Sequence, residues 1–213
     1  MKVTLTFDNG PTAAVTHQVL DTLAAHGVKS TFFLVGDNLR DPANRAAAER
    51  AAGAGHWIGN HTLTHSVQLG DSPDADTARR EIGEAQRLIG ELATPGRLFR
   101  PYGRGGIQDR LLFSRAGLAR LRRDEHTCVL WNSVPRDWDD PDGWVDTCLA
   151  DIATRDWSLV VLHDLATGAM DHLPGFLEGL KGVGADVVQD FPPDCVPIRD
   201  GRVRRSLEHL VAD

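Results

Sequence analysis

The feature that most restricts the fold is a regular alternation of strand-like and helix-like segments along the chain. Short apolar or alternating runs, typical of strands, are separated by stretches whose apolar residues recur with a helical period. The predicted strands are residues 3–7, 30–35, 56–59, 98–100, 127–132, 158–162 and 186–189. The predicted helices are residues 13–26, 42–54, 74–92, 109–122, 141–153 and 173–181. Strands that alternate with helices pair in parallel through right-handed crossovers.

This alternation predicts an α/β fold in which the strands form a closed or nearly closed parallel barrel. A doubly wound open sheet is the alternative. The chain has 213 residues, and about 200 is the lower end of the length that one such barrel needs. Because no Ser/Gly-rich linker interrupts the pattern, we predict one domain over residues 1–213.

Charge and loop composition exclude several classes of partner. Lys and Arg total 23 against 30 Asp and Glu, a formal net charge of −7, so we predict neither a nucleic-acid partner nor a membrane surface. The loop after the first strand, residues 8–11, contains Pro11 where a phosphate-binding loop needs free backbone N–H groups. Nucleotide binding is therefore disfavoured.

Cysteine usage and the first residues bear on the compartment. Cys128, Cys148 and Cys195 are an odd number of widely spaced cysteines, which is typical of reduced thiols rather than of a disulfide framework. Residues 1–7 form a strand-like run without the apolar segment of a secretory signal. We therefore predict a cytoplasmic protein, with a secreted chain whose leader has been removed as the alternative.

Polar and aromatic residues collect where the predicted strands end. In a parallel barrel the active site lies at the carboxyl-terminal ends of the strands. The residues that follow five of the predicted strands are Asp8 and Asn9, His61 and His65, Arg100 and Tyr102, Asp137 and Trp138, and His163 with Asp164. Each has a structural explanation on its own, as turn chemistry or as a core histidine. Their joint placement favours a functional site at this end of the barrel.

Two of these residues suggest a metal site. The spacing of His61 and His65 predicts that both imidazoles lie on one side of a helical turn, which is a common chelating arrangement. Two histidines and one oxygen ligand are typical of a catalytic divalent metal. Among the tryptophans, Trp138 is a candidate sugar-binding wall, whereas we expect Trp131 to lie in the core or at an interface.

The order of these motifs resembles that of the polysaccharide deacetylases of carbohydrate esterase family 4, the NodB-like deacetylases. Their motifs are Thr-Phe-Asp-Asp-Gly-Pro, His-Ser/Thr-x-x-His, Arg-x-Pro-Tyr, an Asp-Trp pair, and an apolar strand that ends in histidine. The corresponding segments here are residues 6–11, 61–65, 100–103, 137–138 and 159–163. The resemblance spans nearly the whole chain and implies a distorted (β/α)7 barrel of this family's type.

The resemblance also implies a role for each site residue. Asp8 corresponds to the general base and Arg100 to the residue that orients it, while His163 corresponds to the general acid that Asp137 tunes. The backbone N–H of Tyr102 corresponds to the group that stabilises the oxyanion. The metal ligands correspond to Asn9, His61 and His65, which implies one divalent cation, with zinc as the first choice and cobalt, nickel or manganese as alternatives.

The third motif appears one residue shorter here, as Arg100-Pro101-Tyr102-Gly103, and the chain also departs from the family pattern at two single positions. Asn9 stands where the family has its metal-binding aspartate, so we expect weaker metal binding, and Val134 replaces an earlier aspartate of the fourth motif. The predicted function is metal-dependent hydrolysis of the N-acetyl group of a sugar or oligosaccharide. The alternatives are an amidase that acts on a small non-carbohydrate substrate and a catalytically weak carbohydrate-binding relative.

Overall fold

Strand β1 (Lys2–Asp8) organises the sheet in the computed structural model, which describes residues 1–212. It pairs in parallel with β6 (Trp157–His163) on one side and with β2 (Thr31–Leu34) on the other. The order of the strands is β6-β1-β2-β3-β4-β5-β8-β9, and β7 pairs separately with the start of β1. The other strands are β3 (Trp57–Asn60), β4 (Leu98–Phe99), β5 (Thr127–Cys128), β7 (Asp186–Val187), β8 (Ile198–Arg199) and β9 (Arg202–Val203).

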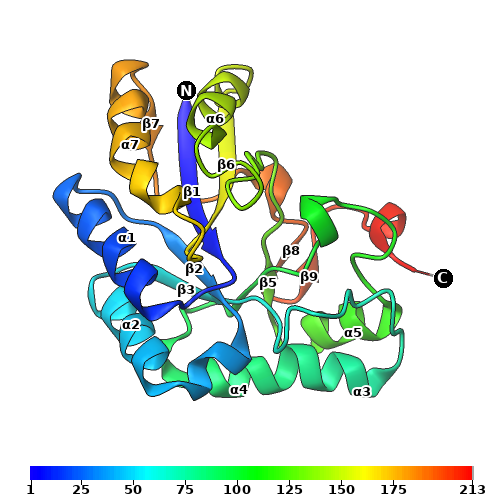
Figure 1. Ribbon diagram of the computed structural model, residues 1–213. Coiled ribbons are helices and arrows are strands. Elements are labelled where there is room, and N and C mark those ends of the chain that lie inside the picture. The colour runs from blue at the N-terminus through cyan, green and yellow to red at the C-terminus, as the bar shows by residue number, and fades with distance from the viewer. Residues whose placement is uncertain (213) are drawn as a thin grey trace.

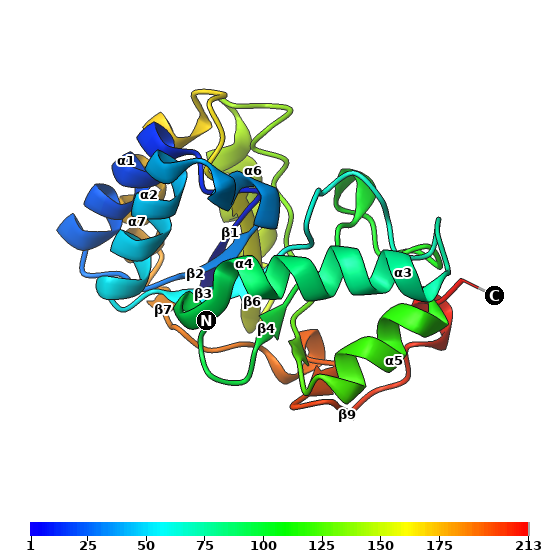
Figure 2. The same ribbon diagram turned by 90° about the horizontal axis from the view of Figure 1, so that it is seen from below.

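Helices cover the outside of this curled sheet (Figure 1). The α-helices are α1 (Ala13–Ala25), α2 (Pro42–Gly53), α3 (Ala75–Ala78), α4 (Ala85–Ile89), α5 (Arg115–Arg123), α6 (Trp144–Ile152) and α7 (Leu173–Gly182). Figure 2 shows that α3 and α4 form one long helical rod with α5 lying beside it. Within residues 1–212, no helix combines the length and the apolar character that crossing a bilayer requires.

The sheet closes through a short segment that follows β5. Ser133 forms a parallel bridge with Val160 of β6, and the backbone N–H of Val161 donates to the carbonyl of Ser133 at 3.0 Å. The side chain of Asn132 adds a hydrogen bond from the N–H of Leu159 at 2.7 Å. The predicted distorted (β/α)7 barrel is therefore confirmed. Its closure comes from this segment rather than from β7, which lies beside β1.

The alternation of residues in β1 separates the outer core from the barrel interior. Val3, Leu5 and Phe7 face outward into the cluster that packs against the covering helices. Thr6 and Asp8 occupy the other face, because successive side chains of a strand point to opposite sides of a sheet. The same period therefore builds the core and delivers a carboxyl group to the interior of the barrel.

Helix boundaries differ from prediction where local capping decides them. The helix predicted over residues 74–92 is present as α3, a π-helical segment η2 (Arg79–Glu84), α4 and a 3-10 turn η3 (Gly90–Leu92). Its α-helical part ends before Gly90, whose φ is 56°. Helix α5 begins five or six residues later than predicted because Ser114 caps it, accepting the N–H of Gly117 at 3.0 Å. Both ends are set by single residues, which a hydrophobic period does not locate.

The strand predicted over residues 127–132 forms ladder pairs only at β5, and a hairpin that the periodicity did not predict lies beside it. Strand β8 pairs antiparallel with β5, and β9 pairs antiparallel with β8. Asp200 and Gly201 between them have φ values of 49° and 72°. Asp-Gly is a typical two-residue hairpin turn, so the signal for this hairpin was present in the sequence.

We predict that Phe7→Ala lowers the free energy of unfolding by about 3–5 kcal/mol, the usual cost of removing a buried aromatic ring. Phe7 is fully buried and stacks on Phe32 at a ring-centroid distance of 5.1 Å. Urea denaturation monitored by circular dichroism measures the change. Val203→Ala, on the exposed side of β9, is the control and should change the value by no more than about 0.5 kcal/mol. Equal stabilities of the two variants would contradict this account of the core.

Candidate active site

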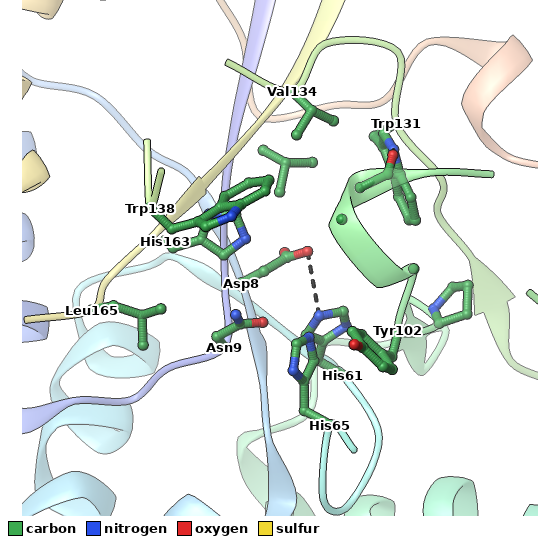
Figure 3. A pocket seen from close by; sticks show the side chains of 15 residues that line it. Asp8, Asn9, His61, His65, Tyr102, Trp131, Val134, Trp138, His163 and Leu165 are labelled. Atoms are coloured by element: carbon green, nitrogen blue, oxygen red, sulfur yellow. Dashed lines mark hydrogen bonds and ion pairs between the residues drawn. The ribbon is translucent and has the colours of Figure 1, made fainter. Parts of the chain in front are cut away.

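A cavity of about 260 Å³ opens at the carboxyl-terminal ends of the parallel strands. Figure 3 shows its side chains converging from separate strands and loops. The residues that line it are Asp8, Asn9, His61, His65, Pro101, Tyr102, Gly103, Gly105, Gly106, Trp131, Val134, Trp138, Val161, His163 and Leu165. Of the residues predicted for the site, seven line this cavity, and Arg100 and Asp137 lie directly behind it. The sequence-predicted set is thus brought together in one place.

The parallel register places Asp8 beside His163. The two residues are Cα partners in the ladder between β1 and β6, and both are the last residues of their strands. Their side chains therefore emerge on the same face of adjacent strands, at the edge where the cavity lies. A carboxyl group and an imidazole are in this way held side by side at the edge of one small space.

Arg100 binds Asp8 from the side of the carboxyl group that faces away from the cavity. It is fully buried, and its Nη1 donates to Asp8 Oδ1 at 2.8 Å and to Thr6 Oγ1 at 2.7 Å. Its Nε donates to the carbonyl of Val129, and its guanidinium lies 4.1 Å from the centroid of the Phe33 ring. These contacts tie one oxygen of Asp8 and leave the other, Oδ2, facing the cavity.

The two histidines of the loop after β3 are held as neutral imidazoles. His61 Nδ1 donates to the carbonyl of Arg100 at 2.9 Å, so Nε2 carries the lone pair. Burial lowers the pKa of both His61 and His65 to about 3. The 3.5 Å approach of His61 Nε2 to Asp8 Oδ2 therefore joins two acceptor atoms and is not an ion pair. Neutral imidazole is the form in which histidine binds metals.

The loop that carries these histidines is irregular, so the predicted helical turn at residues 61–65 is wrong. Thr62 and His65 have φ values of 68° and 52°. For residues other than glycine this region costs about 1–3 kcal/mol each and persists only where the surroundings enforce it. The imidazoles nevertheless lie together, with ring centroids 4.8 Å apart, and Tyr102 covers His65 at 4.1 Å.

Asn9 contributes an oxygen without a donor. Its φ is 70°, a conformation that asparagine tolerates better than most residues. Asn38 Nδ2 donates to the backbone carbonyl of Asn9 at 2.8 Å, and within residues 1–212 the buried side-chain Oδ1 has no hydrogen-bond partner. Figure 3 shows the side chains of Asn9 and Asp8 facing the two imidazoles. Buried polar atoms are rarely left unpaired without a functional reason.

His163 has the opposite protonation preference. Burial by itself lowers its pKa, but the hydrogen bond and the charge of Asp137, together with the charges of Asp8 and Asp164, raise the pKa above its ordinary value. Asp137 is fully buried and accepts from both the backbone N–H of His163, at 2.9 Å, and its Nδ1, at 2.8 Å. Trp138 packs edge-on against the imidazole at 4.7 Å. The remaining ring nitrogen, Nε2, is available to the cavity.

Trp131 and Asp164 contribute to the site in ways that the sequence did not assign to them. Trp131, expected in the core or at an interface, forms part of the cavity wall, where its Nε1 donates to the carbonyl of Gly106 at 2.9 Å. Asp164 is fully buried, and burial raises its pKa to about 7. Its carboxyl group accepts from Thr16 and occupies the space that a Cβ at Gly10 would need. Asp164 follows His163 directly, at the strand end where the sequence placed it among the polar residues, but the sequence assigned it no role.

Residues 1–119 match a family described as polysaccharide deacetylase. A chitooligosaccharide deacetylase from Rhizobium leguminosarum bv. trifolii is 38% identical over 162 residues, which cover 75% of this chain and 70% of the relative. A solved peptidoglycan N-acetylglucosamine deacetylase is 28% identical, with a TM-score of 0.70 and coverage of 93% of this chain and 89% of the other. A family 4 acetyl xylan esterase from Clostridium thermocellum, solved with a cobalt ion, has the same TM-score and identity, and the match covers 88% and 87% of the two chains.

We predict that Asp137→Asn lowers the pKa of His163 by about 1 to 3 pH units, because the charge that stabilises the imidazolium is lost while burial remains. NMR titration of the His163 ring measures it. Asp139→Asn is the control, since Asp139 is exposed and pairs with Arg136 instead. A pKa for His163 in Asp137→Asn equal to that of the unmodified protein would rule out Asp137 as the cause.

Proposed function

The chain belongs to the polysaccharide deacetylase family, and from this premise we propose that it is a hydrolase that removes the acetyl group from an N-acetylated sugar or oligosaccharide. The observation that carries the proposal is the pairing of Asp8 with His163 across one cavity. Each group has a buried partner, Arg100 and Asp137 respectively. Amide hydrolysis needs a base and an acid that both reach the same substrate.

Asp8 acts as the general base in this proposal. Arg100 occupies Oδ1, so Oδ2 is the oxygen that takes a proton from the attacking water. The water oxygen forms a bond to the carbonyl carbon, and negative charge develops on the carbonyl oxygen. The backbone N–H of Tyr102 lies at the cavity wall, and within residues 1–212 it donates to no backbone carbonyl, so it is available to stabilise that charge.

His163 acts as the general acid. Asp137 holds its Nδ1–H and favours the imidazolium, so Nε2 keeps its proton to a higher pH than an ordinary imidazole does. That proton passes to the leaving nitrogen as the C–N bond breaks, and the products are acetate and the free amine. Trp138 restricts the imidazole to one orientation, which keeps Nε2 directed at the cavity.

Asn9, His61 and His65 would hold one divalent cation, and three features of the chain fit it. The imidazoles are neutral, Asn9 Oδ1 has no donor within residues 1–212, and His61 Nε2 faces Asp8 Oδ2 with no proton between them. When bound, the cation supplies a Lewis acid for the amide carbonyl. Zinc is the first choice for two imidazoles and an oxygen, with cobalt, nickel or manganese as alternatives.

The cavity wall supports a carbohydrate as the substrate. Tyr102, Trp131 and Trp138 line a space of about 260 Å³ whose lining residues carry few charges. Aromatic faces suit the apolar faces of sugar rings, while the polar edge of the ring is left for solvent and hydrogen bonds. The related Rhizobium enzyme is named for chito-oligosaccharides, so these are the first substrate to test.

We predict that the purified protein supplied with Zn²⁺ or Co²⁺ releases acetate from acetylated chito-oligosaccharides, and that Asp8→Asn lowers kcat by about 10²- to 10⁴-fold. Asparagine keeps an acceptor for Arg100 but cannot take a proton. Circular dichroism at the assay temperature checks that the variant is folded, and Asp21→Asn on the exposed face of α1 is the control. Acetate release from simple acetamides alone would assign the chain to small-amide hydrolysis, and undiminished turnover by Asp8→Asn would remove Asp8 from the chemistry.

A second prediction concerns Asn9, the oxygen ligand beside the two imidazoles. Asn9→Asp places a full negative charge beside the cation, so retention of the metal against a chelator should rise about 10-fold or more, with higher activity at limiting metal. Aspartate tolerates the φ of 70° at this position as asparagine does. Because Asn-Gly pairs deamidate, peptide mapping of residues 6–11 must first establish that Asn9 is intact. Identical chelator sensitivity of the intact protein and the variant would exclude Asn9 as a ligand.

A further inference from the structure

The loop at residues 61–66 needs support from outside itself. It carries both imidazoles, belongs to no helix or strand, and holds Thr62 and His65 at positive φ. Part of the support comes from the 3-10 helix η1 (Gly36–Arg40), where the N–H groups of Gly36 and Asp37 donate to the carbonyls of Thr62 and Leu63. These bonds hold the first half of the loop and leave the second half, which leads into His65, to another element.

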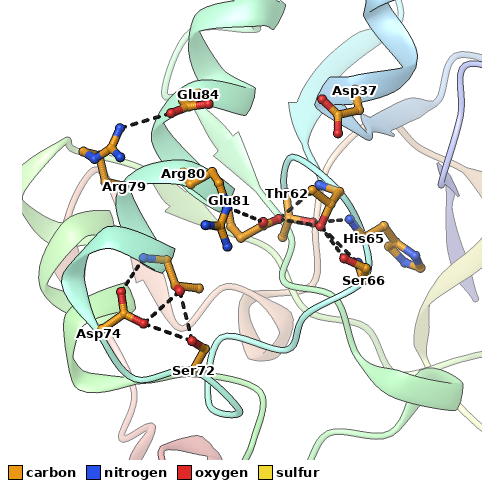
Figure 4. Close-up of polar contacts among 12 residues, drawn as sticks. Asp37, Thr62, His65, Ser66, Ser72, Asp74, Arg79, Arg80, Glu81 and Glu84 are labelled. Atoms are coloured by element: carbon orange, nitrogen blue, oxygen red, sulfur yellow. Dashed lines mark hydrogen bonds and ion pairs between the residues drawn. The ribbon is translucent and has the colours of Figure 1, made fainter.

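Glu81 of the π-helical segment η2 holds that second half. Its side chain is completely buried, and Oε2 accepts from the backbone N–H of Thr64 at 3.0 Å and from Thr64 Oγ1 at 3.1 Å. Figure 4 shows this carboxyl group reaching into the loop from the helix. Burying an acidic side chain is costly unless its oxygens are well paired, so such a residue in a surface helix calls for a role.

The donors and acceptors of these hydrogen bonds form a connected series that reaches the residues on either side of His65. An acceptor oxygen on Glu81 requires that the Thr64 hydroxyl donate to it, so that hydroxyl is free to accept from Ser66 Oγ at 2.7 Å and from the Ser66 N–H at 3.3 Å. His65 lies between these two residues and is itself held by a hydrogen bond from its N–H to Thr62 Oγ1 at 3.2 Å. Glu81 is therefore the final acceptor of a series of hydrogen bonds that joins Thr64 and Ser66, the residues before and after His65.

The π-helical geometry lets adjacent residues of η2 serve both ends of the loop. The carbonyl of Ile82 accepts from Asn60 Nδ2 at 2.9 Å, and Asn60 Oδ1 in turn accepts the N–H of Thr62 at 2.9 Å. Glu81 thus anchors the second half of the loop, and its neighbour anchors the residue that precedes His61. Short π-helical segments within α-helices are frequent at functional sites.

We propose that Glu81 is a positioning residue for the imidazole pair, acting through Thr64 to keep His61 and His65 in the arrangement that binds a divalent cation. The proposal rests on the proposed function, because it assigns these imidazoles to a metal. Glu81 does not line the cavity and touches neither imidazole, so its effect is on ligand geometry rather than on chemistry. The role lies with this carboxyl group and not with negative charge on the helix in general.

The helix offers a matched control for this test. Glu84 belongs to the same π-helical segment, but it is partly exposed and pairs with Arg79, which is also exposed, at 3.0 Å. Glu84→Ala removes a carboxyl group from the same element without touching the loop. Comparison of Glu81→Ala with Glu84→Ala therefore separates loop support from a change in helix charge or helix stability.

Titration with Co²⁺, followed by its visible absorption spectrum, tests the proposal. We expect Glu81→Ala to bind Co²⁺ about 10- to 100-fold more weakly, the usual effect of losing a residue that orients a metal ligand, and to alter the spectrum of the bound ion. Glu84→Ala should match the unmodified protein. Glu81→Gln keeps an oxygen for the Thr64 N–H, so it should recover part of the affinity, and it replaces Glu81→Ala if that variant does not fold. A folded Glu81 variant with unchanged affinity and spectrum would overturn the proposal.

A double-mutant cycle tests the route through Thr64. Thr64→Val removes the hydroxyl group while keeping the shape and the backbone N–H. Glu81→Ala should therefore cost less Co²⁺ affinity in the Thr64→Val background than in the unmodified protein. Strictly additive losses would overturn the part assigned to the Thr64 hydroxyl and would place the support in the Thr64 backbone N–H, which this variant retains.

Hydrogen exchange of the metal-free protein separates failure of this proposal from failure of the proposed function. Glu81→Ala should speed the exchange of backbone amides in residues 61–66, whereas Glu84→Ala should not. If the unmodified protein binds no Co²⁺ but this difference is present, the metal assignment fails and the positioning of the imidazole loop by Glu81 is supported. Unchanged exchange in residues 61–66 would overturn the positioning role whether or not Co²⁺ binds.

Discussion

The buried ion pair between Arg100 and Asp8 is the contact on which the rest of the cavity depends. The guanidinium joins Asp8 and Thr6 of β1 to the carbonyl of Val129 beyond β5, and the carbonyl of Arg100 itself sets the tautomer of His61. Removing one member of such a pair leaves an uncompensated buried charge, which costs about 3–5 kcal/mol. The strands that meet at the cavity therefore cannot shift independently of one another.

Around this pair, one residue type is held in two protonation states. At His61 and His65 the effect of burial outweighs the nearby charge of Asp8, and their pKa values fall to about 3. His163 is also buried, but Asp137 raises its pKa above the ordinary value. Environments that drive the pKa values of like groups apart are how an active site separates its tasks. The nitrogen lone pairs of His61 and His65 are thus available to a cation, and the proton of His163 is available for transfer.

Local sequence determined the parts of this arrangement that depend on a short period or a short motif. The alternation within residues 3–8 determined that Asp8 points into the barrel, and the end of each apolar run determined where polar residues would gather. Strand and helix identity along most of the chain followed from periodicity in the same way. The motif at residues 6–11 marked the site before any contact was known.

Tertiary structure decided what depends on segments that are distant in the sequence. The spacing of the histidines in the loop at residues 61–65 suits a helical turn. Hydrogen bonds that Glu81 accepts from the loop, and others that η1 donates to it, hold the loop in an irregular shape instead. Barrel closure at Ser133, and the position of Trp131 at the cavity wall, likewise depend on which strands become neighbours. The hydrophobic period of a helix or strand shows only which of its faces is apolar. The partner of that face is chosen when the whole chain packs, and no local pattern encodes it.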